Sequence, residues 1–248
     1  MALVTTTVTL ADPAVFREPG PAVDTADDPA SLAVAALAQT RHRDYTVTMV
    51  RTPSDGRVEF PLRLEMDNTD REYAVRRPDD PSTAYDDVVE YGNPYGSWAA
   101  FVPEPGPAAW RSDSREWGDV HLFGGPFELE ARAVKRVRSN DSTVVLNVTD
   151  AAAVYRLFFH APNATDRRPG LRAHAVVAVN RTAGAPRRVT VVTVEPTEDG
   201  GSPVRTRTVM RFHRWDATDV SRPDTIPYTA TEIAEDVAEI DGRLGVTG

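Results

Sequence analysis

Apolar and polar residues alternate over long parts of the chain, which is the pattern of a half-buried β-strand. In residues 57–66 every second position is apolar, and the positions between are mostly charged. Residues 127–138 repeat the pattern, with Ala131, Ala133 and Val137 on the apolar side. Further strands are predicted at 45–51, 71–77, 142–149, 153–160, 171–181, 187–195 and 204–215. Their short, regular spacing predicts an antiparallel meander and a mainly β fold with few helices.

Helical spacing occurs near both ends of the chain. Asp28 is a predicted N-cap with Pro29 at the first helical position, followed by a modest apolar stripe. Residues 228–244 place apolar side chains on one helical face, and Thr229 with Glu232 predicts a capping box. We therefore expect an N-terminal and a C-terminal helix beside the sheet.

Two segments depart from these patterns. Residues 1–27 are rich in Pro, Asp and Ala without periodicity, which predicts a disordered or linker arm before a single domain at 28–248. Residues 78–117 concentrate prolines and aromatic residues, which predicts a long loop of irregular backbone. The aromatic rings either seal the core beneath this loop or form a mobile lid over a cavity.

Charge is unevenly distributed along the chain. Residues 1–126 hold 21 acidic and 11 basic residues, residues 127–248 hold 16 and 17, and the net charge is −9. Lys135 is the only lysine beside 27 arginines, and this composition suggests a salty environment, where counter-ions screen an acidic surface. The acidic balance argues against nucleic acid as a partner.

The sequence offers little support for catalysis. It contains no cysteine, which excludes disulfides, thiol catalysis and cysteine-ligated zinc for these residues. The five histidines lack the spacing of a metal site, and no nucleophile elbow or phosphate loop occurs. Acid pairs such as Asp79 and Asp80 lie where solvated charge is expected. We predict a non-enzyme without cofactor or metal; a hydrolase whose histidine and carboxylates meet only in space is an alternative.

Asparagine usage bears on localisation. Four of the six asparagines stand in N-x-S/T triplets, where about one is expected by chance: Asn140, Asn147, Asn163 and Asn180. This excess predicts N-glycosylation and an extracytoplasmic or cell-surface location. The alternative is that threonine-rich strands produce such triplets without modification. The chain as given shows neither the signature of a secretory leader nor a cysteine for a lipid anchor.

One predicted strand carries a row of positive charge. Arg205, Arg207 and Arg211 share one face of the strand at 204–215. A row of guanidinium groups is suited to binding anionic head groups, as at a membrane surface. The alternative is cross-strand pairing of these arginines with acids such as Glu195.

The order of elements resembles a known family. A helix containing Leu32-Ala33-Val34-Ala35-Ala36-Leu37 runs into Tyr45-Thr46-Val47-Thr48, meandering strands follow, and a late strand at 212–220 leads to Ser221-Arg222-Pro223-Asp224. In this order, over about residues 28–240, the chain is similar to the LolA-like lipoprotein proteins of halophilic archaea. The resemblance implies an open, strongly curved antiparallel sheet, or half-barrel, with helices and an apolar cavity in its concave side. Relatives of that fold carry lipids or lipoprotein acyl chains, whereas most archaeal members have no assigned function.

The expected function is to bind or carry a lipid or another apolar ligand in this concave side. The residues expected to line the cavity are apolar positions of the inner strand face with two aromatic residues of the segment 78–117: Tyr45, Val47, Met49, Phe60, Leu62, Leu64, Trp98, Phe101 and Leu129. The alternative is a cell-surface interaction or structural domain without a ligand cavity. An exposed apolar patch around Trp98, Phe101 and Trp110 would favour that alternative.

Overall fold

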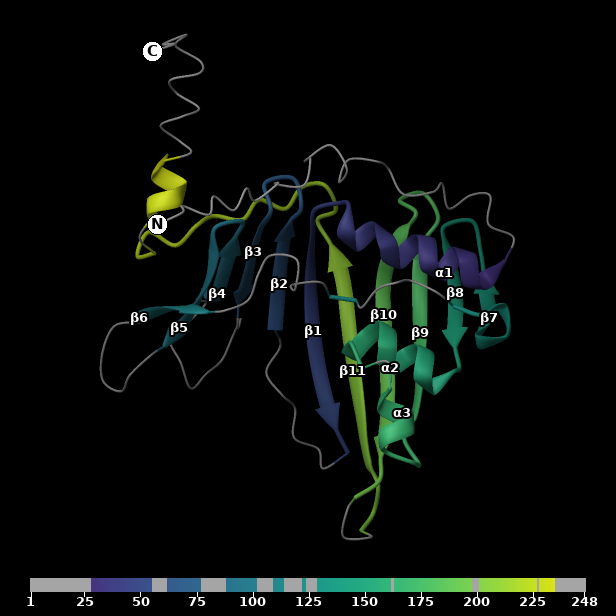
Figure 1. Cartoon of the computed structure of the whole chain (residues 1–248). Coiled ribbons are helices and arrows are strands. Elements are labelled where there is room, and N and C mark those ends of the chain that lie inside the picture. Colours follow the sequence, from purple (N-terminus) through teal and green to yellow (C-terminus); the bar gives the residue numbers. More distant parts are fainter. Residues whose placement is uncertain are drawn as a thin grey trace, which may run out of the picture.

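A single antiparallel sheet of eleven strands dominates the structure (Figure 1). The computed structural model describes residues 28–54, 62–76, 88–101, 109–113, 122–123, 129–161, 163–197, 201–226 and 228–234. The strand order is β6-β5-β4-β3-β2-β1-β11-β10-β9-β8-β7, so two meanders meet where β1 pairs with β11. The edge strands β6 and β7 lie at opposite ends of this order, and the sheet is therefore open. The predicted antiparallel, mainly β fold is confirmed.

The elements follow the chain in simple order. The strands are β1 Tyr45–Pro53, β2 Leu62–Asp67, β3 Glu72–Arg76, β4 Val88–Asn93, β5 Gly96–Phe101, β6 Ala109–Asp113, β7 Val134–Ser139, β8 Thr143–Val148, β9 Arg172–Asn180, β10 Ala185–Glu195 and β11 Val204–His213. The α-helices are α1 Pro29–Ala38, α2 Ala151–Phe159 and α3 Ala164–Arg167, and two short 3-10 turns occupy Gln39–Arg41 and Ala131–Ala133.

The strand register separates the two faces of the sheet. Residues that pair across antiparallel strands share a face. Tyr45 pairs with Met66 on the face against which α1 and α2 pack, here called the helix-covered face. Thr46 pairs with Glu65 on the other face, here called the reverse face. In Figure 1 the three helices lie over the half of the sheet formed by β7 to β11.

Helix α1 forms as its sequence predicts. The Asp28 carboxylate accepts hydrogen bonds from the backbone N–H of Ser31 at 2.8 Å and from its hydroxyl at 2.9 Å, which caps the first turn. The side chains of Ala33 and Ala36 are fully buried and let the helix approach β7, β9 and β10 closely. The helix therefore contributes small buried residues to a closely packed core.

The main core lies between the helices and the helix-covered face. Its largest fully buried members come from both meanders and both longer helices: Tyr45, Tyr73, Phe123, Leu37, Met66, Leu146, Leu157, Val47, Val148, Val154 and Val177. The Phe123 ring contacts Phe158 edge-on at a centroid distance of 5.3 Å and Phe212 at 6.0 Å. Burial of each such side chain contributes about 1.5–3 kcal/mol.

A second, smaller core covers the reverse face of β3 to β5. Trp98 stacks on Tyr91 at a centroid distance of 5.9 Å, and both pack against Val220 and Ile226 of the segment that follows β11. This segment ends in a helical turn at 230–234. The predicted capping box is confirmed, because the Thr229 N–H donates to the Glu232 carboxylate at 2.6 Å and the Glu232 N–H donates to the Thr229 hydroxyl at 3.2 Å.

The prediction of a strand at 153–160 is wrong, because these residues belong mostly to α2. The Asp150 carboxylate accepts a hydrogen bond from the Ala153 N–H at 2.8 Å and thereby starts a helix. Val154, Leu157 and Phe158 are then buried at helical spacing against the sheet. A short apolar run of this kind is compatible with a buried strand or a buried helix, and the Asp150 cap decides for the helix.

Two other expectations change in detail. The segment 127–138 begins its strand only at Val134, and Val137 is 64% exposed instead of inward because a β-bulge falls between Arg136 and Arg138. The segment 78–117 contains β4, β5 and β6 rather than irregular backbone alone. Prolines do not prevent this, because a residue such as Pro94 lies in the tight turn between β4 and β5.

Candidate functional site

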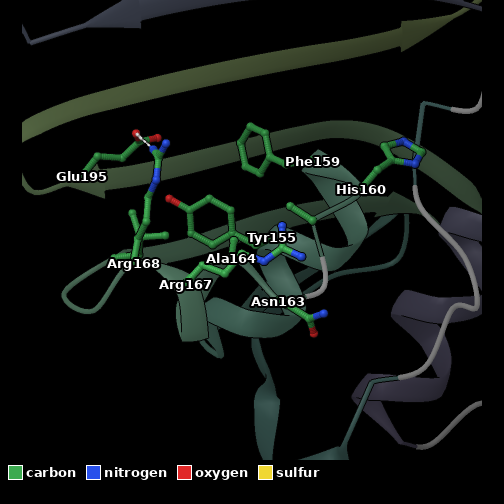
Figure 2. A pocket seen from close by; sticks show the side chains of 10 residues that line it. Tyr155, Phe159, His160, Asn163, Ala164, Arg167, Arg168 and Glu195 are labelled. Carbon is green, nitrogen blue, oxygen red and sulfur yellow. Dashed lines mark ion pairs between the residues drawn. The ribbon is translucent and has the colours of Figure 1, made fainter.

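A cavity of about 590 Å³ lies where α2 and α3 meet the ends of β9 and β10 (Figure 2). Its volume falls within the range of small-molecule sites, about 300–1,000 Å³. Apolar and polar side chains both line it: Tyr155, Phe159, His160, Ala161, Asn163, Ala164, Arg167, Arg168, Leu171 and Glu195. The cavity is on the helix-covered face, away from the fully buried core under α1.

The local sequence explains why the walls lie here. Tyr155 and Phe159 are four residues apart in α2, so both rings project from one side of the helix, with centroids 5.4 Å apart. His160 ends α2 in the left-handed conformation, with φ of 52°, and turns the chain toward α3. Ala164 then places a small side chain at the cavity, which leaves room beside the two rings.

The hydroxyl of Tyr155 is the most unusual polar group of the cavity. The side chain is only 6% exposed, and its hydroxyl is buried without a hydrogen-bond partner in the described part of the chain. Burial raises the pKa of Tyr155, and the negative charge of Glu195 raises it further. The phenol therefore stays protonated and keeps a donor O–H for which the described residues supply no acceptor.

Charged side chains surround this hydroxyl. Arg168 and Glu195 approach each other to 3.9 Å, and their side chains are 69% and 44% exposed, so this ion pair is weak and open to exchange. Figure 2 shows the Tyr155 hydroxyl directed toward this pair. Arg167 adds a second guanidinium to the lining. Two arginines against one glutamate leave the cavity an excess of positive charge.

The chain matches no protein-family model, and no curated protein resembles it closely enough to count as a match.

The predicted cavity residues do not form one site. Tyr45 and Val47 are fully buried on the helix-covered face, and the Tyr45 ring packs against Phe212 and Trp215. Three further residues share this face and are half-buried: Met49, Leu62 and Leu64. Leu129 is half-buried and packs on the same core. Protein side chains thus fill the part of this row nearest α1.

The aromatic members of the prediction lie elsewhere. Trp98 belongs to the reverse face and is buried in the second core. Phe60 and the side chain of Phe101 fall outside the described residues. Trp110 is half-buried and donates a hydrogen bond to the Thr225 hydroxyl at 2.7 Å. The tryptophans of the proposed apolar patch are therefore occupied by internal contacts.

The predicted arginine row is placed as its alternation indicated. Arg205, Arg207 and Arg211 are exposed on the reverse face of β11. Glu195, the acid suggested as their partner, pairs with Val204 and so lies on the helix-covered face, beside Arg168. Glu195 and the arginine row therefore lie on opposite faces of the sheet, so this acid is not a partner of the row.

The four N-x-S/T asparagines occupy different environments. Asn140 is exposed in the β7–β8 turn, and Asn180 pairs with Thr143 at the start of β8, where its side chain accepts hydrogen bonds from the β9–β10 turn. Asn147 is half-buried within β8, and its side-chain oxygen is buried without a partner among the described residues. Asn163 is exposed at the cavity. Glycosylation of these residues stays a prediction.

The described residues contain no group of three or more His, Cys, Asp or Glu side chains arranged to hold a metal ion. They also contain no helix with the length and apolar character needed to cross a membrane.

Sequence reasoning missed the cavity because it missed α2. Asp150, followed by apolar residues at 154, 157 and 158, was the available signal for a capped helix. The sequence does not show that α2 lies beside Arg168 and Glu195, because this arrangement depends on how three elements pack.

Proposed function

We propose that this protein is a non-catalytic binding protein that holds an amphipathic molecule in the cavity between α2, α3 and β10. The observation that carries the proposal is the cavity of about 590 Å³ with the buried Tyr155 hydroxyl on its wall, which has no partner among the described residues. A buried donor without an acceptor costs stability in the free protein, and a ligand acceptor would remove that cost.

The lining indicates the chemical class of the ligand. Phe159, Ala164 and Leu171 offer apolar surface to a hydrocarbon or ring. Arg167 and Arg168 offer guanidinium groups to a carboxylate, phosphate or sulfate. A fatty acid or another lipid with an anionic group satisfies both requirements.

The proposal includes a relation to the LolA-like half-barrel proteins. An open antiparallel sheet with helices on one face is the arrangement that such a relation requires. Compared with the expected cavity under α1, the proposed ligand site lies further along the helix-covered face. An extracytoplasmic location is part of the same proposal and is supported by the exposed sequon residues Asn140 and Asn163.

The proposal is tested by titrating the purified protein with palmitate in a calorimeter. Replacing Ala164 with Trp fills the cavity and is expected to weaken binding at least about tenfold, because the apolar part of the ligand loses its space. The matched control is Ala152→Trp, which adds the same ring to the exposed side of α2. This control should bind palmitate within about twofold of the unchanged protein.

Replacing Tyr155 with Phe gives a second and more diagnostic result. The variant keeps the ring but loses the buried O–H, so we expect palmitate binding to weaken by about tenfold while the unliganded protein becomes more stable. Native mass spectrometry of the purified protein should also detect a bound lipid. Equal palmitate affinity for the unchanged protein and Ala164→Trp would contradict the proposal, as would a loss of stability in Tyr155→Phe.

A further inference from the structure

The reverse face of β9, β10 and β11 carries positive charge without acidic partners among the described residues. No aspartate or glutamate occurs in β1, β7, β8, β9 or β11, and the single acid of β10, Glu195, belongs to the other face. The basic residues that share this surface, here called the arginine face, are Arg172, Arg188, Arg205, Arg207 and Arg211. In a chain with a net charge of −9, this is a strong local segregation of charge.

Positively charged side chains lie opposite each other on the arginine face. Arg188 and Arg211 lie directly opposite each other on β10 and β11, and like charges in that position are destabilising. No ion pair is found for either side chain among the described residues, and the Nε of Arg188 is buried without a hydrogen-bond partner. Such a pair is retained at a cost in stability that an external anion would remove.

The arginines form an array in two directions rather than a single line. Arg205 and Arg207 are separated by two positions along β11, about 6.8 Å, whereas Arg188 and Arg211 sit on neighbouring strands about 4.8 Å apart. Between the charges lie Thr190 and Val209. A linear polyanion would follow one row, but a planar array of anions can engage both directions at once.

We propose that the arginine face binds the phosphate head groups of an anionic lipid membrane. Charge complementarity is the basis of the recognition, since each guanidinium can hold a phosphate through two hydrogen bonds. Those contacts are made at about 2.8 Å, within the Debye length of about 3 Å in 1 M salt, so they are weakened but not abolished in a salty environment. The proposal does not depend on the cavity, which lies on the opposite face.

The test is sedimentation of the full chain with phosphatidylcholine vesicles containing about a third phosphatidylglycerol, compared with phosphatidylcholine alone. The unchanged protein should bind the anionic vesicles and not the neutral ones. Reversing Arg207 and Arg211 to Glu should lower the partition coefficient by at least about tenfold. The neutral variant with Arg207→Gln and Arg211→Gln should show a smaller loss.

A matched control separates this surface from net charge. Arg132→Glu with Arg136→Glu makes the same change in charge at exposed residues that do not belong to the arginine face, and it should bind vesicles within about twofold of the unchanged protein. Arg211→Glu also places an acid opposite Arg188, so its unfolding temperature should rise while its vesicle binding falls.

Three outcomes would overturn the proposal. The first is equal loss of binding in the reversed variant and in the control, which would indicate a non-specific charge effect. The second is absence of binding to the anionic vesicles. The third is binding of heparin, but not of vesicles, that depends on Arg207 and Arg211. The Ala164→Trp variant should bind vesicles normally, so failure of this proposal is distinguishable from failure of the ligand site.

Discussion

Two pairs of opposed arginines occupy equivalent places in the two halves of the sheet. Arg63 of β2 lies opposite Arg76 of β3 on the reverse face, and Arg188 of β10 lies opposite Arg211 of β11 on the same face. The pairs differ in the residue two positions further along the first strand, which is a glutamate in one half and a threonine in the other.

The glutamate makes the first pair part of the structure. Glu65 is buried and contacts both guanidiniums, Arg63 at 2.6 Å and Arg76 at 2.7 Å. Thr190, its counterpart, offers no charge to the second pair. The arginine pair of β2 and β3 is therefore bound by an internal glutamate, whereas the pair of β10 and β11 is left for an external anion. The difference lies in one side chain, which is Glu65 in the first case and Thr190 in the second.

The contrast extends to the surrounding half-sheets. In the half formed by β2 to β5, acids accept hydrogen bonds from neighbouring strands, as Glu90 does from Tyr73 at 2.9 Å and Glu72 from Tyr91 at 2.6 Å. In the half formed by β7 to β11, basic residues outnumber acids and the arginine face has none. In the described part of the first half, Glu65, Glu72 and Glu90 make internal contacts, whereas the arginine face of the second half presents its charge outward.

The largest expected effect comes from making the first pair resemble the second. Glu65→Thr leaves Arg63 and Arg76 opposed without a bridging acid, and we expect the free energy of unfolding to fall by about 2–3 kcal/mol. This is less than the 3–5 kcal/mol of a fully buried pair, because both arginines keep part of their solvation. Urea unfolding measures the change.

The control for this prediction is the same substitution in an exposed ion pair. Glu130 contacts Arg132 with both side chains well exposed, so Glu130→Thr should change the free energy of unfolding by less than about 1 kcal/mol. Equal losses at positions 65 and 130 would contradict the structural role assigned to Glu65.

The reverse exchange should have a smaller effect of opposite sign. Thr190→Glu places an acid between Arg188 and Arg211 in the position that Glu65 has in the other half, and we expect stability to rise by about 0.2–1 kcal/mol. The same acid should compete with phosphate, so binding to anionic vesicles should weaken. Thr190→Gln introduces a side chain of the same size as glutamate without its charge, so it should change stability and vesicle binding little. A Thr190→Glu variant that gains stability and keeps full vesicle binding would break the link between unpaired charge and membrane recognition.

Much of the sheet was predictable because burial of one face imposes a period of two. The strands at 45–51, 171–181 and 204–215 correspond to β1, β9 and β11. The strand face on which Arg207 lies followed directly from the alternation of apolar and polar residues. The capping box at Thr229 and Glu232 was equally readable, because it depends on residues three positions apart.

The candidate sites required information that alternation does not contain. The strand order brings β11 between β1 and β10, and only that register shows Arg188 opposite Arg211 and Glu195 on the other face. A one-residue change in register would have reversed the latter result. The cavity depended on α2 and on the packing that buries the Tyr155 hydroxyl without a partner among the described residues.

The smallest expected effect concerns Glu72, for which burial outweighs the weaker influence of Arg222. Burial raises the pKa of Glu72, while the hydrogen bond from Tyr91 acts in the other direction. The native state therefore takes up a proton at higher pH than the unfolded state, and stability falls as pH rises through that window. Glu72→Gln removes this cost but keeps an oxygen that accepts from Tyr91. We expect it to be more stable than the unchanged protein at pH 7, with the difference shrinking as pH falls through the raised native pKa and vanishing below the ordinary glutamate pKa of about 4.3.

Glu232 supplies the opposite case and so serves as the control. Burial alone would raise its pKa, but hydrogen bonds from Arg222, the Thr229 N–H and Asn93 outweigh burial and lower it. Stability from this group is present above the ordinary glutamate pKa and is lost as pH falls through the lower native value. Glu232→Gln should therefore be less stable than the unchanged protein at pH 7 and approach it in acid. Urea unfolding at several pH values measures both variants, and stability differences of the same sign at pH 7 would contradict the assignment that a buried acid stabilises only where its hydrogen bonds outweigh the cost of burial.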